Sequence, residues 1–150
     1  MKRKNLVLMM SFIIASTICA CKVFDSKSQN NKGTSSSSLN GTWRLNYISG
    51  ARIAFNGLYP NAKPEMTFDT AKGEVQGNTS CNGFRSTITI SGNKLTIAEP
   101  GPMTMMYCEG GGERNFLDML KKVTSYNVND TTLNLIQGDI AVMRFTRIKK

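Results

Sequence analysis

The sequence predicts a mainly β domain with one helix, an antiparallel meander curled into a partly open barrel. Short runs in which apolar and polar residues alternate have the period of strands with one buried face. Glycine, asparagine and aspartate separate these runs over short distances, which favours antiparallel hairpins. One segment, residues 113–123, has the helical period instead.

The alternating runs are spread from residue 43 to residue 145. Their apolar members are Trp43, Leu45 and Tyr47; Met66 and Phe68; Ile88 and Ile90; Leu95 and Ile97; Tyr126 and Val128; Leu133 and Leu135; and Ala141, Met143 and Phe145. Turn residues stand between them at 69–73, 91–93, 129–130 and 138–139. About eight short strands of this kind are typical of a meander that curls toward a barrel.

Residues 113–123 are expected to form a helix that packs against the sheet or plugs the barrel. Glu113 stands in its first turn and Lys121 in its last, and both charges suit the helix dipole. Three glycines at 110–112 supply a flexible approach to it. The predicted apolar face consists of Phe116, Leu117, Leu120 and Val123.

Residues 1–20 have the features of a secretory signal peptide. Three basic residues precede an apolar run at 6–18, which is short for a permanent membrane span. Residues 21–38 are polar and are expected to form a disordered tether that starts at a lipid-modified Cys21. Residues 39–150 are expected to form the folded domain.

Cys21 follows Ile18-Cys19-Ala20, which resembles the lipobox of bacterial lipoproteins. In that pattern the cysteine thiol takes a diacylglycerol and the peptidase cuts before the cysteine. The residue directly after Cys21 is lysine and not aspartate, so we expect an envelope protein that is lipid-anchored in the outer membrane. Ordinary signal cleavage that leaves a free cysteine is the alternative.

Cys81 and Cys108 are the remaining cysteines of the expected mature chain. In an oxidising compartment such a pair in a small domain indicates a disulfide. A redox or nucleophilic pair would need a lowered thiol pKa, usually from a CxxC spacing or a neighbouring imidazole. The sequence has neither, and it contains no histidine at all. A structural disulfide is therefore predicted.

The missing histidine also excludes Ser-His-Asp catalysis and His-ligated zinc. The formal charge of +9 falls to +6 without the signal, and the basic residues are scattered, so no nucleic-acid partner is expected. Glu109 and Glu113 lie four residues apart, as an acid/base pair could, but Glu113 already suits a helix start. We predict no catalytic residues, no metal site and no cofactor.

Met103 and Met105 would share one face if residues 103–108 were a strand. The expected role of this face is to fill the core, with the floor of an adaptable apolar pocket and a thioether copper site as alternatives. The predicted binding or core face consists of Trp43, Met103, Met105, Phe116 and Leu120. Residues 81–83 are expected to form a tight turn held by the disulfide, with a recognition loop as the alternative.

Five segments in this order resemble the META/HslJ domain family. They are GTWRL at 41–45, GNTSCNGF at 77–84, MTMMYC at 103–108, Glu113 before Phe116 and Leu120, and TLNL at 132–135. The resemblance covers residues 39–148 and implies an antiparallel β architecture interrupted by a helix, in secreted or envelope-anchored bacterial proteins. It implies no established enzymatic activity. Residues 52–60 and 99–102 depart from the family pattern.

The expected function is that of a non-catalytic, envelope-anchored lipoprotein whose domain is a binding or stress-tolerance module. Its expected partners are the membrane, through the lipid anchor, and an envelope protein or an apolar ligand. The first alternative is a carrier that holds an apolar ligand or acyl chain in a small barrel cavity. The second is an envelope hydrolase.

Overall fold

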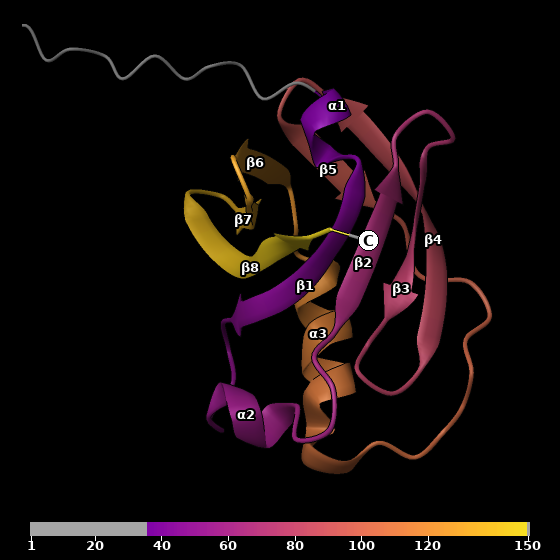
Figure 1. The fold of residues 1–150 in the computed structure, drawn as a ribbon, viewed down its shortest axis with the longest axis vertical. Coiled ribbons are helices and arrows are strands. Elements are labelled where there is room, and N and C mark those ends of the chain that lie inside the picture. The colour runs from indigo at the N-terminus through magenta and orange to yellow at the C-terminus, as the bar shows by residue number, and fades with distance from the viewer. Residues whose placement is uncertain (1–35, 150) are drawn as a thin grey trace, which may run out of the picture. The chain divides into compact units, whose positions relative to one another are not determined.

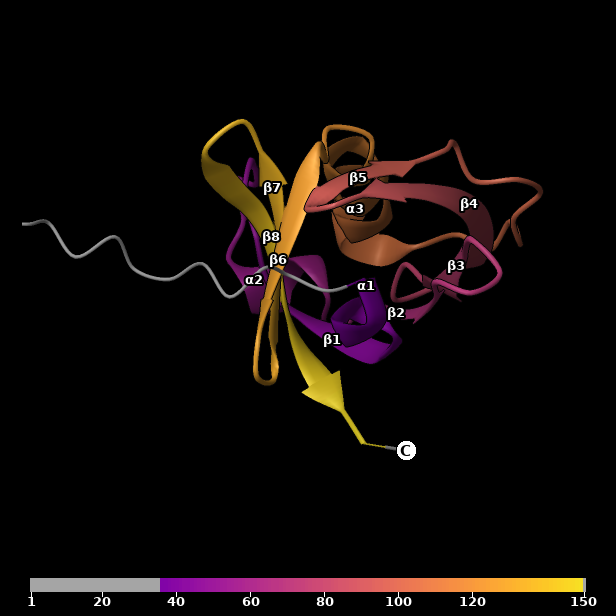
Figure 2. The same cartoon turned by 90° about the horizontal axis from the view of Figure 1, so that it is seen from above.

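The computed structural model describes residues 36–149, which form a closed antiparallel barrel (Figure 1, Figure 2). Each strand pairs with the next along the chain, and the last pairs with the first. The strands are β1 (Gly41–Ile48), β2 (Glu65–Asp69), β3 (Glu74–Asn78), β4 (Gly83–Ser91), β5 (Lys94–Ile97), β6 (Ser125–Asn129), β7 (Thr132–Gln137) and β8 (Ile140–Ile148). The helices are α1 (Ser36–Leu39), α2 (Phe55–Leu58), the 3-10 turn η1 (Glu109–Gly111) and α3 (Gly112–Leu120).

The prediction of an antiparallel β barrel with one main helix is confirmed, and the barrel closes where a partly open one was expected. Closure depends on a short seam between β5 and β6. There the strands pair at Lys94 and Ser125, and the Leu95 amide donates to the Thr124 carbonyl at 3.1 Å. The connection between these two strands contains η1 and α3.

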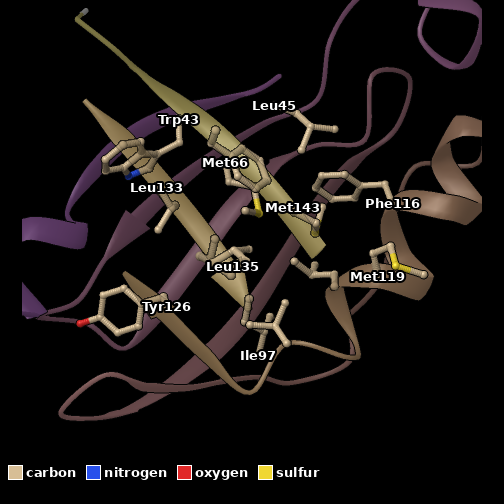
Figure 3. Close-up of a cluster of buried hydrophobic side chains, with 14 of the residues drawn as sticks. Trp43, Leu45, Met66, Ile97, Phe116, Met119, Tyr126, Leu133, Leu135 and Met143 are labelled. Atoms are coloured by element: carbon tan, nitrogen blue, oxygen red, sulfur yellow. The ribbon is translucent and has the colours of Figure 1, made fainter. Parts of the chain in front are cut away.

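The core fills the barrel with side chains from nearly every strand and from α3 (Figure 3). Trp43, Tyr126, Phe145 and Met143 are fully buried. Phe116 of α3 packs on Phe84 of β4, with ring centroids 5.8 Å apart. The sequence predicts a helix that continues to residue 123, whereas α3 ends at Leu120. Its buried residues are Gly112, Phe116, Met119 and Leu120, and Leu117 is only partly buried.

Tyr47 does not continue the inward face of β1, although the alternation predicted that it would. The pairing of β1 with β8 shifts register between Leu45 and Tyr47, as at a β-bulge. The extra residue turns Tyr47 outward, where it is 40% exposed and lies under the Arg144 guanidinium. Ile48 takes the inward position instead.

Strand β3 was not among the predicted runs, because Val75 is its only buried apolar residue. Gly77 occupies the position where a second inward side chain would be expected. A Cβ at this position would lie 2.0 Å from the Glu65 carbonyl oxygen of β2. The close approach of these two strands therefore requires glycine and removes the apolar signal.

Arg147 fastens the start of the domain to its last strand. Its guanidinium donates to the carbonyl oxygens of Asn40, at 2.6 Å, and Ser38. It also lies 4.1 Å from the centre of the Trp43 ring, whose Nε1 donates to the Leu39 carbonyl at 2.8 Å. The predicted signal peptide, Cys21 and most of the tether lie outside the described residues. Within residues 36–149, no helix has the length and apolar character needed to cross a membrane.

Candidate functional site

Residues 103–108, here called the methionine loop, present three adjacent apolar side chains to solvent. Met105 is 93% exposed, Met106 60% and Tyr107 90%. The segment has no regular secondary structure and leads from β5 toward η1. Contiguous apolar surface of this kind is uncommon on a soluble domain and marks an interaction site more often than a single exposed residue does.

The loop is held in place by one buried side chain, Asn82, which is 1% exposed. Its Oδ1 accepts hydrogen bonds from the Thr104 hydroxyl at 2.9 Å and from the Met106 amide at 2.8 Å. Its Nδ2 donates to the Met106 carbonyl at 3.0 Å. Asn82 therefore holds the Thr104 side chain before Met105 and the Met106 backbone after it, while the side chains of Met105 and Met106 make none of these bonds.

Asn82 is itself fixed within the turn that connects β3 to β4. The Asn82 amide donates to the Thr79 hydroxyl at 3.1 Å, and the Thr79 amide donates to the Asn82 carbonyl at 2.9 Å. Ser80 completes this turn with a positive φ of 89°. The turn is thus a rigid support, which favours the predicted tight turn over a recognition loop.

Glu113, in the first turn of α3, joins this support. The Asn82 Nδ2 donates to its Oε1 at 3.1 Å, and the Thr79 hydroxyl donates to its other carboxylate oxygen. The carboxylate thereby satisfies two buried donors and ties the helix to the turn. Glu109, the other member of the sequence pair, lies in η1 and is exposed.

The predicted disulfide is confirmed: Cys81 and Cys108 are bonded, with Cα atoms 5.9 Å apart. Cys81 precedes Asn82, and Cys108 ends the methionine loop. The bond therefore joins the same two segments that the Asn82 hydrogen bonds join. Two independent constraints, one covalent and one polar, hold the loop against the barrel.

The core-filling role predicted for Met105 is wrong, whereas Met103 is partly buried and packs against the core. The alternation rule assumes a strand, and residues 103–108 have no strand neighbour that would impose it. Trp43, Phe116 and Leu120, the other predicted members of a binding or core face, are all buried core residues.

A hollow of about 310 Å³ lies beside the loop. It is lined by Pro60, Asn61, Ser80, Cys81, Tyr107, Cys108 and Glu109. Tyr59, which precedes Pro60 in the sequence, donates its hydroxyl hydrogen to the Gly112 carbonyl at 3.1 Å, and burial raises the pKa of this phenol. Tyr59 thus connects the end of α2 to the beginning of α3.

A second hollow, of about 390 Å³, lies along α3 and is lined in part by Glu99, Met103, Leu117 and Lys121. The Lys121 ammonium is 2.8 Å from the Glu99 carboxylate, and its hydrogen bond lowers the pKa of Glu99. Among residues 36–149, no group of three or more cysteine or acidic side chains is placed to hold a metal ion.

Sequence reasoning singled out residues 81–83 and 103–108 separately and missed that they form one unit. The available signal was the pair of motifs, GNTSCNGF and MTMMYC, which together carried the family resemblance. The structure brings both motifs into contact through Asn82 and the disulfide.

Comparisons with known proteins agree with this fold. The family model described as META domain matches residues 36–150. A Burkholderia xenovorans protein solved by NMR is 20% identical, with a TM-score of 0.59 over 76% of this chain and 86% of that one. A DUF4847 family protein from Bacteroides vulgatus is 16% identical, with a TM-score of 0.51 over 75% of this chain and 95% of that one. No curated protein matches the sequence.

Proposed function

The chain belongs to the META domain family, and from this premise we propose that it is a non-catalytic binding module of the cell envelope, which docks a protein partner through the methionine loop. The observation that carries the proposal is the exposure of Met105, Met106 and Tyr107 on a loop that Asn82 holds through the Thr104 hydroxyl and the Met106 backbone. A loop fixed before binding loses little conformational entropy when it docks.

The side chains themselves suit a protein interface. Tyrosine and methionine are enriched at such interfaces, and tyrosine is frequent among the residues that dominate binding energy. Methionine adapts its shape to an apolar partner surface. The hollow beside Tyr107 adds a concave edge to the protruding loop.

The contents of the barrel argue against the alternative of an acyl-chain carrier. Bulky side chains, among them Trp43, Tyr126 and Phe145, fill the interior with 0% exposure. The hydrolase alternative has weaker support still, because Glu113 is engaged with Thr79 and Asn82. The carrier would need an empty interior, and an acid/base pair would need a free Glu113 carboxylate.

The position of the loop favours a protein partner over lipid head groups. In Figure 1, α1 lies at one end of the described domain and α2 at the other. Tyr107 shares its hollow with Pro60 and Asn61, which follow α2 and Tyr59. The methionine loop therefore lies toward the end of the described domain opposite α1, where the chain enters it.

A photoreactive aromatic residue in place of Tyr107 is expected to cross-link one discrete envelope protein in intact cells. The matched control carries the same group at Tyr47, an exposed aromatic position on β1. Replacing Met105 and Met106 with serine should reduce the cross-link at least about tenfold, since removing hot-spot contacts costs about 1.4 kcal/mol or more. Equal cross-linking from positions 47 and 107, or no effect of the serines, would contradict the proposal.

We further propose that the domain is held on the outer membrane by lipid on Cys21. Cells fed an alkyne fatty acid should label the wild-type chain and the Cys19→Ser variant but not Cys21→Ser. Cys19 is the matched control, because it lies two residues away within the expected signal. Equal labelling of all three chains would disprove the anchor, and label lost only from Cys19→Ser would place the lipid at the other frame.

A further inference from the structure

The methionines of the described domain fall into two classes. Met66 and Met143 are 0% exposed and Met119 is 7% exposed, whereas Met105 and Met106 are 93% and 60% exposed. Met103, two residues before Met105, is partly buried against the core. Neighbouring residues of one short segment thus differ sharply in their access to dissolved reagents.

Met105 and Met106 are exposed on a restrained segment. Asn82 accepts hydrogen bonds from the Thr104 hydroxyl and the Met106 amide and donates to the Met106 carbonyl, so turning the Met106 backbone to bring its side chain inward would break hydrogen bonds of a buried side chain. The disulfide at Cys108 restrains the segment on its other side. The two thioethers therefore meet solvent in the folded state, without any prior opening of the domain.

We infer that Met105 and Met106 form a modification site, at which peroxide converts the thioethers to methionine sulfoxides. The sulfur attacks one peroxide oxygen, the O–O bond breaks and an S–O bond forms. The departing hydroxide takes the proton of the transferred hydroxyl and leaves as water. Sulfur loses two electrons and the peroxide gains them. Methionine sulfoxide reductases, one for each sulfoxide epimer, reverse the change.

Sulfoxidation changes the loop without changing the fold. The new oxygen is a strong polar acceptor on what was an apolar side chain. Since Asn82 holds the loop through the backbone of Met106, its bonds survive the modification. An oxidised loop would no longer suit an apolar partner surface. This consequence rests on the proposed function, whereas the modification itself does not.

The test is limited oxidation of the full chain, purified in detergent, with dilute hydrogen peroxide. After the disulfide is reduced, trypsin releases residues 95–114 as one peptide that contains Met103, Met105 and Met106, so that Met103 serves as an internal control. Fragmentation mass spectrometry measures the sulfoxide at each position. Met105 and Met106 should oxidise at least about tenfold faster than Met66 and Met143, which react only when the domain opens.

Three further readouts decide the inference independently of any partner. The Met105→Leu/Met106→Leu variant should lose the fast phase, and the oxidised wild type should keep its circular dichroism and its disulfide. The reductase pair should restore the unmodified mass. Oxidation of Met143 at the rate of Met105, or loss of the fold with the first two oxygens added, would overturn the inference.

Discussion

Replacing Trp43 with alanine is expected to lower the free energy of unfolding by about 3–5 kcal/mol, the usual cost of removing a buried aromatic side chain. Trp43 has no exposed surface, and its Nε1 donates to the Leu39 carbonyl. The Arg147 guanidinium lies over the ring and would lose that contact as well. Urea denaturation followed by circular dichroism measures the change.

Two controls separate burial from a general effect of aromatic truncation. Trp43→Phe keeps a ring under Arg147 and should recover part of the loss. Tyr47→Ala removes a half-exposed aromatic from the same strand and should cost less than Trp43→Ala. Trp43 is the only tryptophan, so the fluorescence of the folded chain reports its surroundings. An emission maximum typical of water would contradict its place in the core.

The second large effect is expected from the disulfide. Replacing both Cys81 and Cys108 with alanine should lower the free energy of unfolding by about 2–5 kcal/mol, as is usual for disulfides of small secreted domains. The bond joins residues 27 positions apart in sequence, and its loss frees that part of the unfolded chain. Denaturation of the wild type in the absence of reductant provides the reference.

Asn82→Ala tests the polar half of the same support. It keeps the disulfide but leaves buried partners, among them the Met106 amide, without the side chain that pairs them, at a cost of about 1–3 kcal/mol. The disulfide and the Asn82 hydrogen bonds join the same segments. The variant that combines Asn82→Ala with both cysteine replacements should therefore lose an amount of unfolding free energy that differs from the sum of the separate losses. A double cysteine variant as stable as the wild type would show that the disulfide contributes nothing to the fold.

The strands that sequence reasoning found are those whose buried faces follow the simple alternation. Leu133 and Leu135 of β7 are an example: both are fully buried, and the polar Asn134 stands between them. Phe116 and Leu120 similarly predicted the buried face of α3. Local periodicity sufficed here, because one side of each element faces the core and the other faces solvent.

The features that escaped prediction depend on contacts between distant segments. The outward turn of Tyr47 follows from register with β8, about a hundred residues later in the chain. β3 lacks an apolar pattern because Gly77 must let β2 approach. The exposure of Met105 depends on the path of residues 103–108, which Asn82 holds through the Thr104 hydroxyl and the Met106 backbone. The alternation of Met103 and Met105 predicted a shared buried face, but this segment is not a strand and Met105 is exposed.

The hydrogen bonds that Arg147 makes at the start of the domain have a mechanical consequence. Tension along the chain enters the described domain at α1, where the Arg147 guanidinium donates to the carbonyl oxygens of Ser38 and Asn40. Beyond it, β1 is flanked by β2 and β8, and the hydrogen bonds of both ladders cross the strand direction. A pull along β1 loads these bonds together in shear and does not peel them one by one. A partner that pulls on the methionine loop of a tethered chain would thus load the two ladders of β1 together.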